Sequence, residues 1–226
     1  KPILFFFFYI LRKNLIASLF LGFVTAFVGI TPPGLINMTA AKVNLKEGKR
    51  SAFWFVLGAV IVIFFQATLA ILFAQFIKEH PDVIVLLREV GFGIFSALTI
   101  YFLLIAKKPK KKKGKIKKRS TSTRFFLGML LSALNFFPIP YYVFVSITLA
   151  SYNLFYFNMT DIFVFVTGVV LGSFLVFYFY ITFFQKIQDK TDYFLRNMNT
   201  IIGSITGFIS LITLINIIRY YLKSFY

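Results

Sequence analysis

Residues 29–37 read Gly-Ile-Thr-Pro-Pro-Gly-Leu-Ile-Asn and interrupt an apolar run, 14–41, that is long enough to cross a membrane. Pro32 and Pro33 have no backbone N–H to continue a helix, and Gly34 tolerates conformations that other residues avoid. The helix is therefore predicted to break halfway along the run. Unpaired backbone groups are tolerated at that depth only against protein or a water-filled cavity, so the break should face inward.

A second break is predicted in the run 124–152, where residues 135–140 read Asn-Phe-Phe-Pro-Ile-Pro. Interrupted helices at matching places in the two halves of a chain are the best sequence indication of a central binding site in a transporter. The alternative interpretation is a pair of structural kinks without ligand contact. The pairing of two double interruptions favours a binding site.

The composition places the chain in a bilayer. Hydrophobic residues make up 59% and the mean hydropathy is +0.83, whereas soluble domains are roughly 45 to 50% apolar. A membrane crossing takes about 20 apolar residues. We expect an all-α integral membrane protein with one membrane domain and six transmembrane helices, at 14–41, 51–77, 83–106, 124–152, 162–186 and 194–222.

The opening stretch is apolar around Phe5–Phe8, but Arg12 and Lys13 separate it from the first run. It is too short to cross a bilayer on its own. Two interpretations stay open, an interfacial segment and the remnant of a longer leader.

The net charge of +18 is concentrated in one run, Lys107–Arg119. Cytoplasmic loops carry the Lys and Arg excess, so this run predicts a cytoplasmic loop, 107–123, with both termini outside. The first interpretation of the run is a solvated loop that sets the orientation, and the alternative is contact with anionic lipid headgroups. Nucleic acid is not expected as a partner, because no aromatic recognition element is interleaved with the lysines.

The two halves resemble each other. Gly22 aligns with Gly128 at an offset of 106, and the same offset brings Pro32 onto Pro138. Offsets of 110 and 114 align the remaining pairs of runs; they include Phe55 with Phe165, Gly58 with Gly168 and Ser96 with Ser210. We expect two three-helix repeats, 14–106 and 124–223. An odd number of crossings makes the second repeat inverted, as in many transporters.

The polar groups near the two breaks are uncharged. Asn37 and Asn135 offer both donors and acceptors, which suit a zwitterionic or polar solute. The predicted substrate-binding residues are Thr31, Pro32, Pro33, Gly34, Asn37, Gln66, Asn135, Pro138 and Pro140. The chain has no cysteine and one histidine, so no metal, cofactor or catalytic residue is expected.

A family resemblance follows from the first helical hairpin. Pro33-Gly34 with Asn37, then Lys42, the turn 46–50 and Gly58 resemble the LysE family of amino-acid exporters (LysE/RhtB-type translocators). In that family a Pro-Gly-Pro element breaks the first helix, and Leu35 stands here in place of its second proline. The spaced pair Asn135 and Pro138 is similar to the family's asparagine-proline element.

The predicted function is therefore a secondary exporter of amino acids or related small solutes in the cytoplasmic (inner) membrane, working by alternating access. The alternative is a membrane module that anchors or assembles other subunits without transport. The solute, the coupling ion and the choice between monomer and homo-oligomer stay open at this point.

Overall fold

The computed structural model describes the backbone of residues 2–106 and 120–225. Side chains are described within these ranges except at 2–14, 81–85, 87–88, 184–196, 198 and 223–225. The basic run Lys107–Arg119, and with it the predicted lipid contact, lies outside the described residues. In the described ranges the chain is helical, without a strand.

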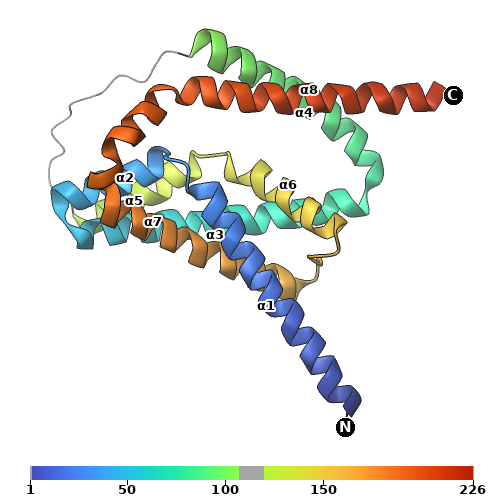
Figure 1. The fold of residues 1–226 in the computed structure, drawn as a ribbon, viewed down its shortest axis with the longest axis horizontal. Coiled ribbons are helices and arrows are strands. Elements are labelled where there is room, and N and C mark those ends of the chain that lie inside the picture. The colour runs from blue at the N-terminus through green and yellow to red at the C-terminus, as the bar shows by residue number, and fades with distance from the viewer. Residues whose placement is uncertain (1, 107–119, 226) are drawn as a thin grey trace. The chain divides into compact units, whose positions relative to one another are not determined.

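The helices follow one another along the chain as drawn in Figure 1. They are α1 (Pro2–Ile30), α2 (Leu35–Glu47), α3 (Lys49–Glu79), α4 (Pro81–Ile100) with a π-helical end η1 (Tyr101–Ile105), α5 (Thr121–Ala133), α6 (Pro138–Ser151), α7 (Met159–Arg196) and α8 (Met198–Phe225).

Both predicted breaks are present. The bend between α1 and α2 is 79°, and the bend between α5 and α6 is 60°. At the first break Gly34 has extended backbone angles, φ −125° and ψ 176°, and α2 starts directly after it. At the second break Pro138 opens α6, a helix position at which the missing N–H is not needed.

Up to five of the six predicted crossings are found among the described residues. Among the described residues, three single helices are long and apolar enough to span a membrane, and the two bent pairs raise the number to five. The predicted third crossing, 83–106, corresponds to α4 and η1, whose described apolar part is the shorter segment Glu89–Ile105. The expected separation at Arg12 and Lys13 is wrong for the backbone, because α1 continues through both residues.

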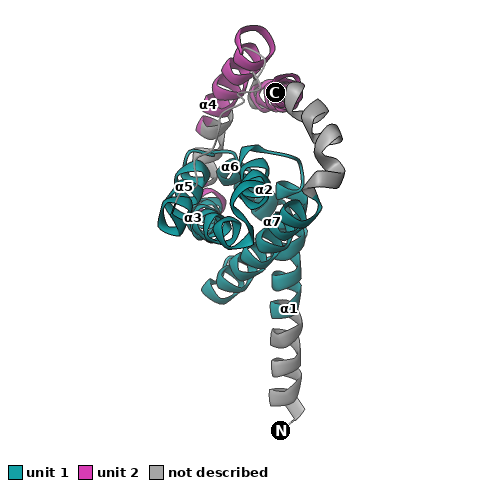
Figure 2. Cartoon of the chain, turned by 90° about the vertical axis from the view of Figure 1, so that its left-hand side faces the viewer, with its two compact units in different colours: residues 1–76, 115–187 teal, residues 77–114, 188–226 magenta. Residues whose placement is uncertain are grey.

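The chain forms two compact units, coloured separately in Figure 2. The first contains residues 1–76 and 115–187, and the second contains 77–114 and 188–226. Each unit therefore combines segments from both predicted repeats.

Glycines bring the helices of the first unit into backbone contact. A Cβ added to Gly22 of α1 would stand 2.0 Å from the carbonyl oxygen of Phe165 in α7. A Cβ added to Gly58 of α3 would stand 2.1 Å from the carbonyl oxygen of Phe125 in α5. In each pair the residue numbers of the contacting positions increase in the same direction along both helices. Helix α1 therefore runs parallel to α7, and α3 runs parallel to α5.

The second unit is held by hydroxyl groups between α4 and α8. The hydroxyls of Ser96 and Ser210 are 2.8 Å apart, and the Thr99 hydroxyl donates to that of Thr206 at 3.0 Å. Positions rise along α4 as they fall along α8, which makes the two helices antiparallel. Small residues and hydroxyls of this kind are typical of helix contacts inside membranes.

Candidate functional site

The first break leaves carbonyl groups at the end of α1 without helical partners. The side-chain amide of Asn37, which is 4% exposed, donates to the carbonyl oxygens of Ile30 at 2.6 Å and Pro32 at 3.1 Å. Since unsatisfied buried carbonyls are costly in an apolar surrounding, this amide stabilises the broken conformation. Asn37 therefore has a structural role at the predicted site.

A tyrosine from α7 completes the first break. The Tyr180 hydroxyl donates to the carbonyl oxygen of Thr31 at 2.7 Å. The Thr31 hydroxyl itself donates to the carbonyl of Phe27, inside α1. Both groups are thus engaged with the backbone of the broken helix.

The second break is held by the same chemistry. Nε2 of Gln66, on α3, donates to the carbonyl oxygens of Ser132 at 3.1 Å and Asn135 at 2.9 Å. Gln66 is 7% exposed, and among the described residues its Oε1 has no hydrogen-bond partner. At each break a buried carboxamide therefore binds backbone carbonyls, and both carboxamides, Asn37 and Gln66, come from the first half of the chain.

Tyr141 brings the two breaks close to each other. It follows the prolines at the start of α6, and its hydroxyl donates to the carbonyl oxygen of Thr25 on α1 at 2.9 Å. A Cβ added to Gly29, just before the first break, would stand 2.5 Å from the Tyr141 ring. The start of α6 thus lies against the end of α1.

The other predicted site residues differ in their surroundings. Pro32 and Pro140 are exposed, and Pro33, Gly34, Asn135 and Pro138 are partly buried. Asn135 contributes its backbone carbonyl to the contact with Gln66. A surface cavity of about 260 Å³ lies elsewhere, at the start of α5; it is lined by Trp54, Thr121, Ser122, Phe125 and Phe126.

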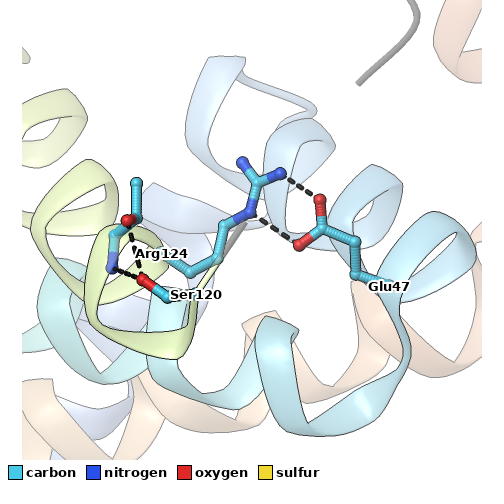
Figure 3. Close-up of polar contacts among 4 residues, drawn as sticks. Glu47, Ser120 and Arg124 are labelled. Atoms are coloured by element: carbon cyan, nitrogen blue, oxygen red, sulfur yellow. Dashed lines mark hydrogen bonds and ion pairs between the residues drawn. The ribbon is translucent and has the colours of Figure 1, made fainter. Parts of the chain in front are cut away.

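A buried ion pair joins the end of α2 to the start of α5. Nε of Arg124 donates to Oε2 of Glu47 at 2.8 Å, and a second guanidinium nitrogen contacts Oε1, as Figure 3 shows. The two side chains are 3% and 2% exposed. Ser120 caps α5 by accepting from the backbone N–H of Thr123 at 3.2 Å, which fixes the helix turn that carries Arg124.

A second buried carboxylate lies at the start of α7. Asp161 is 4% exposed and accepts from the hydroxyl of Ser18, on α1, at 3.0 Å and from the amide of Asn158 at 2.7 Å. Asn158 in turn accepts from the backbone N–H of Asp161 at 2.8 Å, so the pair caps α7.

The comparison with known families decides the identity of this arrangement. A family model described as LysE type translocator matches residues 27–216, which include both breaks, both buried amides and the ion pair. The chain belongs to this family. It is a multi-pass membrane protein of a transporter family, as its apolar helices also indicate. No curated protein and no solved structure matches the chain.

Sequence reasoning missed two tyrosines of this LysE translocator. Tyr141 and Tyr180 bind the backbone near the first break, but the chain has 12 tyrosines and 33 phenylalanines, which hide any single aromatic. The ion pair of Glu47 with Arg124 was also missed, because both residues were interpreted as charges at the ends of helices. Three further polar residues in the same runs, Thr39, Thr68 and Ser146, donate to carbonyls of their own helices.

Proposed function

We propose that this LysE translocator exports amino acids or related small polar solutes across the cytoplasmic membrane by alternating access. The solute binds between the two breaks. The residues proposed to form the site are Thr31, Pro32, Pro33, Gly34, Asn37, Gln66, Asn135, Pro138 and Pro140.

The observation that carries the proposal is the pair of broken helices whose last carbonyls are bound by buried amides from elsewhere. Asn37 serves the first break and Gln66 the second. A membrane protein that only anchors a partner has no need of irregular backbone midway along two apolar runs, whereas transporters build substrate sites from such segments. The alternative role as an anchoring or assembly module is therefore disfavoured.

Equivalent contacts support the proposed inverted repeat. The sequence offsets equate Gly22 with Gly128 and Phe165 with Phe55. A Cβ on Gly22 would stand 2.0 Å from the Phe165 carbonyl oxygen, and one on Gly128 would stand 1.9 Å from that of Phe55. The contact of α1 with α7 thus has a counterpart between α5 and α3, as an exchange of the two halves requires.

The second unit supports the same symmetry. Ser96 and Ser210, which the offset of 114 equates, face each other across antiparallel helices at 2.8 Å. Two equivalent residues in contact with each other lie on the two-fold axis that relates them. In an inverted repeat this axis lies in the membrane plane.

The proposed topology has six crossings, with both termini outside and the loop 107–123 in the cytoplasm. The first and fifth crossings then run inward and the second and fourth outward. The observed parallel pairs, α1 with α7 and α3 with α5, fit this arrangement.

Counterflow in proteoliposomes tests the function. Vesicles loaded with one unlabelled amino acid should accumulate the same labelled amino acid transiently, and a panel of amino acids identifies the solute. Gln66→Leu should abolish counterflow. The matched control is Thr68→Val, two residues further along α3, because that hydroxyl donates only to the carbonyl of Phe64 in its own helix. If no amino acid shows counterflow, or if Gln66→Leu transports normally, the proposal is wrong.

A further inference from the structure

Gln66 carries a buried acceptor that no protein group uses. Both partners of its Nε2, the carbonyls of Ser132 and Asn135, are acceptors. The amide nitrogen must therefore face them, and the amide oxygen must face the other way. Gln66 is 7% exposed and Oε1 has no partner among the described residues. Buried polar atoms rarely stay unpaired. The oxygen is closed off in this conformation, so a donor from outside the chain reaches it when the surrounding helices move apart.

Four side chains around the breaks, those of Asn37, Gln66, Tyr141 and Tyr180, already use their donors within the protein. The two amide hydrogens of Asn37 go to Ile30 and Pro32, and those of Gln66 go to the second break. The hydroxyls of Tyr141 and Tyr180 donate to backbone carbonyls of α1 and the first break. The capacity left to these side chains is therefore to accept hydrogen bonds.

The backbone favours positive charge at the same place. Helices α1 and α5 end at the two breaks, and the carboxyl end of a helix carries a partial negative charge that stabilises cations. Residues 15–46, 50–78 and 121–157 contain no Asp or Glu, so no carboxylate of these segments competes for the role. The first N–H groups of α2 have no side-chain cap and tolerate a carboxylate.

We propose that Gln66 Oε1 accepts a hydrogen bond from the protonated amino group of the solute, and that this amino group is the determinant by which the site selects its substrates. The inference rests on the proposed export function and assigns the substrate class of the same site. Primary amines bind, with or without a carboxylate. Analogues whose nitrogen is acylated have no charge on the nitrogen and keep a single, neutral N–H donor.

Binding to the purified protein in detergent tests this selection without transport. The probes are L-leucine, L-lysine and L-serine, each compared with its methyl ester and with an analogue in which every amino group is acetylated. The readout is the binding constant from thermal stabilisation. We expect the esters to bind like the parent amino acids and the acetylated forms to bind about ten- to a hundredfold more weakly, the range expected for a hydrogen bond from a charged donor. Equal binding of the acetylated and parent forms overturns the inference.

Variants assign the selection to Gln66. In Gln66→Met the ratio between the binding constants of the parent and acetylated forms should fall to about one, while Thr68→Val keeps the wild-type ratio. Gln66→Glu keeps a side chain of the same length, and its protonated form retains one donor and one acceptor. The preference of Gln66→Glu for amines should increase as the pH rises, because the carboxylate that forms attracts the protonated amino group. This variant keeps the test decisive if Gln66→Met fails to fold.

The outcomes separate the two proposals. Selective amine binding without counterflow refutes export and leaves the role of Gln66 standing. Two outcomes refute the role of Gln66 and leave export standing, provided that counterflow is observed. In the first, Gln66→Met keeps the wild-type ratio between the binding constants of the parent and acetylated forms. In the second, the preference of Gln66→Glu for the parent amines does not change with pH. A water molecule as the natural partner of Oε1 would give no discrimination against acetylated analogues, which also refutes it.

Discussion

Removal of one partner of the ion pair between Glu47 and Arg124 should destabilise the protein strongly. The side chains are 3% and 2% exposed, so Glu47→Gln or Arg124→Gln strands a charge inside the protein. Breaking a buried pair in this way costs about 3–5 kcal/mol, because the remaining charge has lost both water and its partner. We expect each single variant to lose that amount of unfolding free energy.

The double replacement Glu47→Leu with Arg124→Met should cost much less. Apolar residues of similar volume in place of a buried pair are often neutral, or stabilising by about 1–4 kcal/mol, since no charge has to be removed from water. A double variant that is more stable than either single variant would therefore identify the stranded charge as the cause. A double variant as unstable as the sum of both single variants would refute this reasoning.

The chain supplies its own probe for the measurement. Trp54 is the only tryptophan, and its ring lies 6.3 Å from the ring of Phe125, the neighbour of Arg124 in sequence. Tryptophan fluorescence during denaturant titration of the protein in micelles therefore reports on this contact. If either single variant lost less than about 1 kcal/mol, the pair would behave like an exposed salt bridge and its burial would be wrong.

Three further predictions concern packing, the site and topology. Gly22→Ala should sharply reduce thermal stability because its Cβ would stand 2.0 Å from a backbone oxygen, whereas Gly91→Ala, with nothing within 4 Å, should be neutral or stabilising. Asn135→Leu should abolish counterflow at a normal yield of folded protein, since only its backbone carbonyl is engaged; normal transport would contradict the site. Ser120→Cys, in a chain without other cysteines, should react with membrane-impermeant maleimide only from the cytoplasm, and labelling of intact cells would contradict the topology.

The breaks could be predicted from the sequence because their cause is local. Proline lacks the N–H that a helix needs, and Pro32, Pro33 and Pro138 interrupt the helices where the pattern indicated. The sequence also indicated Asn37 and Gln66 as polar groups near the breaks, and in the structure both amides bind backbone carbonyls there. Their partners could not be predicted, since Gln66 lies 66 and 69 residues from the carbonyls it binds.

Other features depend on the tertiary structure. Counting charges for topology treats Arg124 as a solvated cation, and only the approach of α2 to α5 makes it half of a buried pair. Asn37→Leu should abolish counterflow, and the same limit applies to it, because the sequence alone gives no reason to expect a lower folded yield. Because its amide binds two carbonyls, the substitution should also lower stability by about 1–3 kcal/mol for each buried group left unpaired.

The pairing of α4 with α8 has a consequence for how the protein is made. The carbonyl of Ala106, just after η1, accepts from the side chain of Asn199 at the start of α8, and 93 positions separate the two residues. At about 5–20 residues per second, a ribosome needs roughly 5 to 20 s to add that length of chain. During this interval α4 is inserted without its partner, and the Thr99 hydroxyl can donate only to the carbonyl of Phe95 in the same helix. A helix made later therefore completes one made about 93 residues earlier, and a chain truncated before α8 leaves α4 permanently without its polar contacts to α8.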